Sequence, residues 1–251
     1  MRTLLKIVLT LLLIIAALVF FAPASLLDSG LDRASKGKWR LAETTGTLWN
    51  GSGMLMHTQG HEQGAVLTPL RWRFEPSALP SGTARWQLLA DETTPRLTGV
   101  LTLGRKGVGL DGLSLHTSAA VLQPLLPPEM VQALEGVLII DAPSLLLHEK
   151  GQEGRISGRW QNAQMVFQKV PVDLGNVSFN IDSRQQSSHS VINNEGGAVS
   201  LDGNFQTNTS GKPTQGTLKI TPRSDAPEAL LQLLSTTGQP DAQGAYVLEM
   251  N

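Results

Sequence analysis

Five histidines and one glycine-rich run are the residues whose type and spacing could support chemistry. His57 and His61 form an H-x-x-x-H pair, a spacing that on a helix presents two imidazoles to a zinc ion. Gly60 and Gly64 interrupt this stretch, so we expect polar loop histidines and no metal site. Residues 107–112 (GVGLDG) match G-x-G-x-x-G, but a dinucleotide fingerprint must open a helix, and the next residues alternate as a strand does. These glycines are therefore predicted at hairpin and bulge positions.

Patterns typical of enzymes are missing from the sequence. There is no cysteine, G-x-S-x-G elbow, S-x-x-K motif, Walker A loop or EF-hand loop, and the carboxylates are scattered singly. We therefore predict no catalytic, cofactor-binding or metal-binding residue, no cofactor, and a protein that is not an enzyme. The balance of 20 Lys and Arg against 21 Asp and Glu also argues against a nucleic-acid partner, which requires a basic face.

The N-terminal stretch is the most apolar part of the chain. Residues 7–21 (IVLTLLLIIAALVFF) contain one polar residue, and with their neighbours they reach the length of about 20 residues that spans a bilayer. Arg2 and Lys6 precede this stretch and acidic residues follow it, which by the positive-inside rule places the N-terminus in the cytoplasm. We predict a cytoplasmic tail over 1–5, a single-pass transmembrane anchor over 6–23 in the inner membrane, and a periplasmic C-terminal domain.

A cleaved signal peptide is the alternative interpretation of the same stretch. Ala22-Pro23-Ala24 has the small-x-small form of a cleavage site, although Pro23 stands inside the triplet. Both interpretations deliver the rest of the chain across the membrane. The absence of cysteine is compatible with an oxidising compartment, which permits disulfides without requiring them.

After a linker or helix extension over 24–38, the pattern changes to short strands. Residues 70–75 (LRWRFE) alternate apolar and charged with period two, as a half-buried strand does, and residues 84–88 (ARWQL) repeat the pattern. Similar alternations recur downstream with glycines between them. Residues 39–251 are therefore predicted to form one large, twisted antiparallel β-sheet domain, which makes the protein mainly β.

Three interruptions of the strand pattern are expected. Pro80-Ser81-Gly82 is predicted as a turn. The other two are short helical insertions. Residues 118–134, with Ser118 as the N-cap and three prolines, should form two short helical turns in series. Residues 225–236 should form one helix with Asp225 as its N-cap.

Weak internal similarity suggests a two-fold duplication of the β domain, with repeats over 39–145 and 146–251. Trp160 follows Trp49 by 111 residues, and the two stand in similar short stretches. Leucine-rich segments at 122–126 and 231–234 are separated by 109 residues at their starts. A chance match of short apolar strings would produce the same similarity.

Tryptophan is concentrated in the first third of the chain, where four of the five tryptophans lie between residues 39 and 86. Trp72 and Trp86 fall on the apolar side of alternating runs, which predicts that they pack in the core of the sheet. A surface platform for carbohydrate or peptide is the alternative use of these rings.

The sequence resembles protein N of the bacterial type II secretion system, also called the general secretion pathway protein N family. The anchor followed by Pro23-Ala24 contributes to this resemblance. Short motifs after it contribute more, namely the G-T-L-W-N-G box with Gly46, Trp49 and Gly51, the Pro69 to Trp72 strand, the strand ending at Trp86, and the step at Gly136. The likeness covers nearly the whole chain. Residues 171–175 (PVDLG) depart from the Pro-Leu-Gly step of the family pattern, and the chain ends at Asn251, close behind the last expected strand.

The resemblance implies an accessory component of the machine that exports folded proteins from the periplasm across the outer membrane. It implies no catalytic or ligand-binding residue, so the motif residues above are expected to be structural. The implied partners are other inner-membrane components, especially the protein C-type subunit, and indirectly the outer-membrane secretin.

Two other functions remain open from the sequence. An inner-membrane-anchored lipid carrier would show a continuous apolar groove that no helix or sheet covers. A periplasmic glycan-active or glycan-binding protein would show a surface row of tryptophans beside two carboxylates. A secretion scaffold would instead show a covered core.

Overall fold

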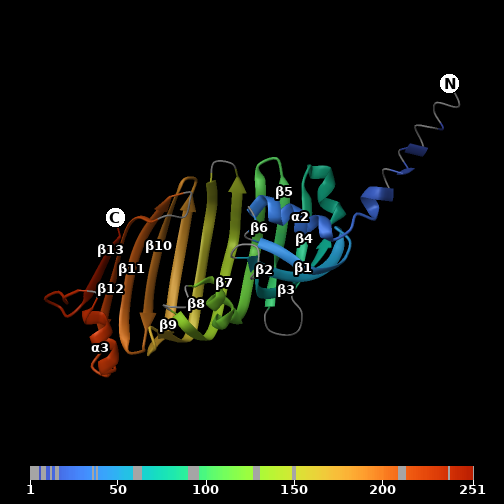
Figure 1. Cartoon of the computed structure of the whole chain (residues 1–251). Coiled ribbons are helices and arrows are strands. Elements are labelled where there is room, and N and C mark those ends of the chain that lie inside the picture. Colours follow the sequence, from blue (N-terminus) through green and yellow to red (C-terminus); the bar gives the residue numbers. More distant parts are fainter. Residues whose placement is uncertain are drawn as a thin grey trace.

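The structure is a computed structural model of the chain. It describes residues 6, 10–11, 13–14, 17–35, 37, 39–58, 64–89, 96–126, 131–148, 151–208, 213–236 and 238–250. The expected cytoplasmic tail, residues 1–5, lies outside this set, and so does part of the expected anchor over 6–23. The residues described between 6 and 20 are helical and lead away from the sheet (Figure 1). Across the described ranges, no helix has both the length and the apolar character required to cross a membrane.

One antiparallel sheet contains all the strands of the described chain, and each strand pairs with the strand that follows it in sequence. This continuous meander confirms the prediction of a mainly β protein with one large antiparallel sheet. In Figure 1, β1 and β2 run across the direction of the later strands, so the sheet is strongly twisted at that end. The strands are β1 (Trp39–Gly46), β2 (Asn50–Thr58), β3 (Gly64–Phe74), β4 (Ala84–Leu89), β5 (Arg96–Gly104), β6 (Gly107–Ser118), β7 (Val131–His148), β8 (Gly151–Phe167), β9 (Val170–Arg184), β10 (Ser187–Glu195), β11 (Val199–Asn208), β12 (Pro213–Pro222) and β13 (Tyr246–Met250).

Two short helices precede β4. α2 (Ser25–Ser35) lies in the expected linker region and packs against β1. η1 (Pro76–Ser81) is a 3-10 helix where a turn was predicted. Pro76 fixes a helical φ at its start, and Gly82, with φ of 73°, ends it in the left-handed region.

The two predicted helical insertions are present but shorter than expected. η2 (Ala119–Leu125) begins after Ser118, whose hydroxyl accepts a hydrogen bond from the Ala120 N–H, as predicted. The prediction of a second helical turn up to 134 is wrong for residues 131–134, because these residues already pair with β8. α3 (Glu228–Ser235) has Pro227 as its N-cap instead of Asp225, since the fixed φ of proline starts the helix there.

The register of the sheet sorts side chains onto two faces of opposite character, because residues directly opposite each other in antiparallel strands share a face. One row of paired residues crosses the sheet from β5 to β13 and is apolar throughout. We call it the apolar row; it consists of Leu97, Leu115, Ile140, Gly158, Phe179, Ile192, Gly203, Leu218 and Leu248. The adjacent row projects from the other face. We call it the polar row; it consists of Ser114, Asp141, Ser157, Asn180, Val191, Asn204, Thr217 and Glu249.

Buried apolar clusters gather near the ends of the strands. One joins Ala24 to Trp72 and Trp86 beside α2. Another joins η2 to the start of β7, and a third joins α3 to the starts of β9 and β11. The middle of the sheet is less buried: Leu115, Ile140, Phe179, Ile192, Leu218 and Leu248 of the apolar row are all partly exposed.

The internal duplication stays a prediction. Each expected half ends with a short helix followed by a strand, η2 before β7 and α3 before β13. However, Trp49 lies at the corner between β1 and β2, whereas Trp160 lies inside β8. The two stretches that suggested the repeat therefore occupy different places in the fold.

Candidate functional site

The G-T-L-W-N-G box forms the joint between the apolar N-terminal segment and the sheet. It fills the corner between β1 and β2, where Thr47 pairs with Pro23 in an isolated antiparallel bridge. The Ala24 N–H donates to the Gly46 carbonyl oxygen at 3.2 Å, and the Leu48 N–H donates to the Ala22 carbonyl oxygen at 2.8 Å. The backbone leaving the apolar segment is therefore built into the sheet.

Three tryptophans close this joint with their indole N–H groups. Trp49 Nε1 donates to the Val19 carbonyl oxygen at 2.8 Å. Trp72 and Trp86 donate at 3.1 Å to the carbonyl oxygens of Thr47 and Leu48. We call the set Ala22–Ala24, Gly46–Gly51, Trp72 and Trp86 the junction cluster. The indole N–H groups supply hydrogen bonds to backbone carbonyl oxygens at this corner, where a neighbouring strand does not supply them.

The two glycines of the box stand where a side chain has no room. A Cβ on Gly51 would lie 2.4 Å from the Thr45 oxygen and 2.7 Å from a ring carbon of Trp72. Gly46 has φ of 84°, and a Cβ there would lie 2.5 Å from the Asn50 oxygen. Glycine is therefore required for the close approach of β1 to β2 and of the corner to the Trp72 ring.

Of the other motif residues, Pro69 belongs to the same sheet region and Gly136 does not. Pro69 pairs with Met54 in β2, and among the described residues β3 pairs with β4 from Arg71 onward, so no described ladder bond to β4 is lost through the missing N–H of Pro69. Gly136 lies at a bulge in β7 with φ of 105°. There Trp160 Nε1 donates to the Glu135 carbonyl oxygen at 2.7 Å.

The structure thus brings Gly46, Trp49, Gly51, Trp72 and Trp86 together. Gly136 lies elsewhere, beside Trp160. Trp72 and Trp86 are 2% and 8% exposed, which agrees with the prediction of core packing. Because their rings are covered, they cannot form a surface platform for a glycan.

Helix α2 is bonded to the edge strand β1 through Asp28. Its carboxylate accepts hydrogen bonds from the Leu41 N–H at 2.8 Å and from Arg40 Nη2 at 2.7 Å. The Arg40 bond, more than the backbone bond, holds the pKa of Asp28 below its usual range. Asp28 therefore protects part of the β1 edge while it ties α2 to the sheet.

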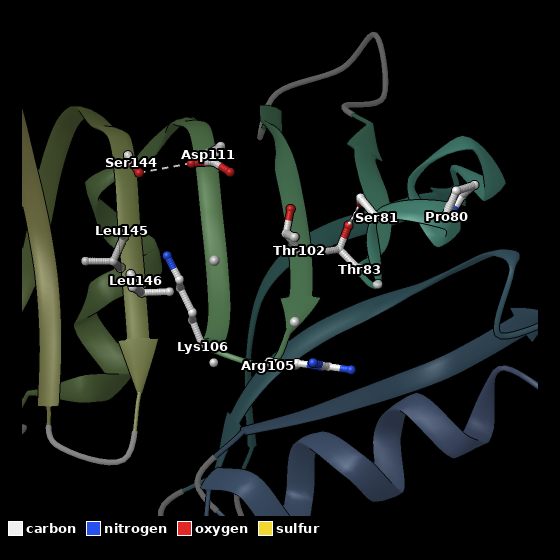
Figure 2. A pocket seen from close by; sticks show the side chains of 14 residues that line it. Pro80, Ser81, Thr83, Thr102, Arg105, Lys106, Asp111, Ser144, Leu145 and Leu146 are labelled. Carbon is white, nitrogen blue, oxygen red and sulfur yellow. Dashed lines mark hydrogen bonds between the residues drawn. The ribbon is translucent and has the colours of Figure 1, made fainter.

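A hollow of about 660 Å³ lies over the β5–β6 hairpin, between η1 and β7. Figure 2 shows Arg105 and Lys106 leaving the hairpin tip in different directions, and Asp111 accepting a hydrogen bond from Ser144 at 3.0 Å. Asp111 is the single carboxylate among its lining residues, and no histidine lines it. The hollow thus offers neither a paired acid and base nor a serine activated by histidine.

His57 and the glycine run at 107–112 both lie on strands. His57 lies on β2 and not in a loop as predicted; its ring packs edge-on against Trp39, with centroids 5.0 Å apart. Strand pairing with β1 continues through His57 and overrides the polar loop pattern. His61 lies outside the described residues. Within the described ranges, no three His, Asp or Glu residues cluster as a metal site. Residues 107–112 belong to β6, with Gly107 at the hairpin end and Gly112 in the left-handed region, as predicted.

Several residues that build the joint gave no motif in the sequence. Ala22 and Ala24 are small apolar residues that resembled a cleavage site, and Thr47 and Leu48 contribute only backbone oxygens. From the sequence alone, Asp28 is one of the acidic residues that follow the apolar stretch. A carboxylate 12 residues before an arginine has no local signal, because the sheet edge brings the two together.

Comparison with known protein families gives a match over most of the chain. The sequence model of the family described as type II secretion system (T2SS), protein N, matches residues 37–249. This range begins after the apolar segment and extends from β1 into β13. No curated protein and no solved structure matches the chain.

Proposed function

The chain belongs to the type II secretion system protein N family, and from this premise we propose that it is a non-catalytic, single-pass component of the inner membrane. Family membership makes it a component of type II secretion and implies contact with other components of that system. The proposed topology places the N-terminus in the cytoplasm and the sheet domain in the periplasm, where it assists export of folded proteins across the outer membrane. The proposed partners are the protein C-type subunit and, indirectly, the outer-membrane secretin.

The abrupt change in exposure at the junction is the observation that supports membrane anchoring. Leu18, Phe20 and Phe21 are 69%, 69% and 71% exposed, whereas Ala24 is 2% exposed. Fully burying one Leu or Phe side chain contributes about 1.5–3 kcal/mol, so a row of such side chains in water is unfavourable. A bilayer around the helical segment removes that cost, and the sheet starts where the exposure ends.

The geometry of Ala22-Pro23-Ala24 supports retention of the anchor. Proteolytic cleavage needs an exposed, flexible segment. Here Ala22 and Ala24 are buried, Pro23 is bridged to Thr47, and two backbone hydrogen bonds hold the segment to the box. Cleavage after Ala24 would remove Ala22, Pro23 and Ala24 from the fold, together with the bridge and hydrogen bonds that they make.

We assign partner docking to the polar face of the first strands. Arg73, Arg85 and Arg96 are exposed on β3, β4 and β5, and the register places them on the face opposite Trp72 and Trp86. A chain with net charge −1 thus concentrates positive charge on one surface. Such a surface steers an acidic partner toward it.

A secretion assay in cells lacking the gene tests the proposed role. The full chain should restore release of exported proteins, and without it these proteins should accumulate in the periplasm. Resistance to alkaline extraction and an intact mass that includes residues 1–24 should show a retained anchor. Normal secretion without the protein would overturn the role, and a mass lacking residues 1–24 would overturn the anchor alone.

A further inference from the structure

We infer that the face of the sheet bearing the apolar row holds the acyl chains of membrane phospholipids. This inference rests on the proposed anchoring of the chain in the inner membrane, and it goes beyond a scaffold role because it assigns a ligand.

The face has the composition of a lipid-contacting surface. None of the paired residues of the apolar row is acidic or basic, and the row runs without interruption over strands β5 to β13. A further row on the same face begins Leu101, Leu110, Leu145 and Gly154, again without a charge. Charged residues such as Asp141 and Glu249 instead occupy the polar row.

Glycines keep the face open while rings line it. A Cβ on Gly158 would lie 2.1 Å from the Phe179 ring, so this ring lies directly against the strand beside it. Gly203 is similarly close to Ile192 and to the Phe205 ring, and Gly216 lies under the same ring. Large apolar groups that lie flat on glycine give a smooth surface and do not fill the space above it.

The helices of the described chain do not pack over the middle of the apolar row. α2 packs on β1, η1 on β4, η2 on β7 and β3, and α3 on β9. The clusters that contain η2 and α3 lie near the strand ends. Leu97, at the β5 end of the row, is buried, whereas Leu115 and Phe179 are partly exposed. An apolar sheet face of this width needs a cover in water, because soluble proteins rarely expose large contiguous apolar patches.

The face is continuous with the site where the chain would leave the membrane. Trp86 of the junction cluster pairs with Leu101, and Leu101 pairs with Leu110 on the same face. The apolar helical residues end at the same cluster, where Trp49 holds the Val19 oxygen. The apolar side of the sheet is therefore continuous from the junction cluster to the apolar row.

An acyl chain fits this face better than a polypeptide does. A bound extended peptide would need partners for its own N–H and C=O groups, and the side chains of the row provide none. Peptides instead add to the edge of a sheet, where main-chain bonds are available. A hydrocarbon chain has no hydrogen-bonding groups, so none is left without a partner when it lies on this face.

Photo-crosslinking in the native membrane tests this assignment with controls one residue away. A benzophenone amino acid replaces Leu115, Phe179 or Leu218 in the full chain, and, as matched controls on the opposite face, Ser114, Asn180 or Thr217. Cells are labelled with radioactive phospholipid. We expect phospholipid adducts several-fold more abundant at the apolar positions than at their neighbours. Equal labelling on both faces, or adducts at the apolar positions to a second copy or another protein, would overturn the inference.

A second pair of variants separates ligand loss from misfolding. Leu115→Glu should lose most of the phospholipid that co-purifies with the chain in mild detergent, whereas Asn180→Glu, at an exposed position on the opposite face, should keep it, with the β-sheet circular dichroism unchanged in both. Retention of phospholipid by a folded Leu115→Glu variant would contradict the inference. A crosslinker at Phe20 reports on the anchor separately: lipid adducts there without adducts at Leu115 would overturn the lipid face and leave the anchored secretion role intact.

Discussion

The indole nitrogen of Trp49 and the backbone oxygen of Val19 are 2.8 Å apart, and this bond joins the family-like box to the apolar segment that precedes the sheet. Together with the Pro23–Thr47 bridge, it makes the junction a structured joint and not a flexible linker. The sheet therefore has a defined orientation relative to the proposed anchor. Any surface of the sheet, polar or apolar, is therefore held in a defined orientation to the end of that segment.

Removing the indole donor of Trp72 should weaken this joint. Trp72→Phe keeps an aromatic ring but leaves the partly buried Thr47 oxygen without its donor, a loss of about 1 kcal/mol. We expect a lower midpoint in urea unfolding of the full chain in detergent, and faster proteolysis near residues 21–24. Trp39→Phe, at the other end of β1, is the control and should leave the proteolysis rate unchanged. Equal proteolysis of both variants would contradict the role of Trp72.

Gly136 should tolerate no side chain. Gly136→Ala places a Cβ at φ of 105° and 2.4 Å from the Gln161 oxygen, so we expect a loss of about 1–3 kcal/mol. The control is Gly109→Ala on β6, where the nearest atom to a new Cβ is 3.7 Å away. Thermal unfolding of both variants would measure the difference. A Gly136→Ala protein as stable as the control would show that the bulge relaxes.

The Asp28–Arg40 pair should make the stability of the joint depend on pH. Because the folded pKa of Asp28 is lowered, its contribution is fully present above the unfolded pKa of about 3.9 and is lost as pH falls through the folded pKa. The melting temperature of Asp28→Asn should therefore be lower than that of the wild type at pH 7, and the gap should close in acid. Arg40→Gln should behave alike, and the double variant should add little. A gap that persists unchanged at pH 2 would contradict this account.

Alternation in the sequence was sufficient to predict the sheet. Residues such as Arg71 and Trp72 carry opposite chemistry at neighbouring positions, and only a strand with two different faces uses that pattern. The same period also sorted Trp72 and Trp86 into the core. The sequence does not show the register of the strands. The register places Leu115, Ile140 and Phe179 in one row although they are far apart in sequence.

The junction could be predicted only in part. Its box was visible as Gly46, Trp49 and Gly51, because short glycine and tryptophan motifs stand out. Its other half was not, since Ala22 and Ala24 have no polar group and their role depends on backbone atoms of a corner more than 20 residues later. Helix limits also differed where pairing with β8 outweighed local helix signals at 131–134.

Reversing charge on the polar face of β3 and β4 should disrupt docking and leave the fold intact. Arg73 and Arg85 are exposed on adjacent strands, and the contact of Arg85 with Glu75, at 3.8 Å between side-chain atoms, is loose. Exposed ion pairs contribute only about 0–1 kcal/mol, so Arg73→Glu with Arg85→Glu should change the melting temperature little. Co-purification of the protein C-type subunit should fall at least several-fold, because like charges would then face an acidic partner.

Arg159→Glu with Lys219→Glu, on the same face of β8 and β12, is the matched control and should retain the partner. Equal loss in both double variants would indicate a general charge effect, and retention in both would move the docking site away from β3 and β4.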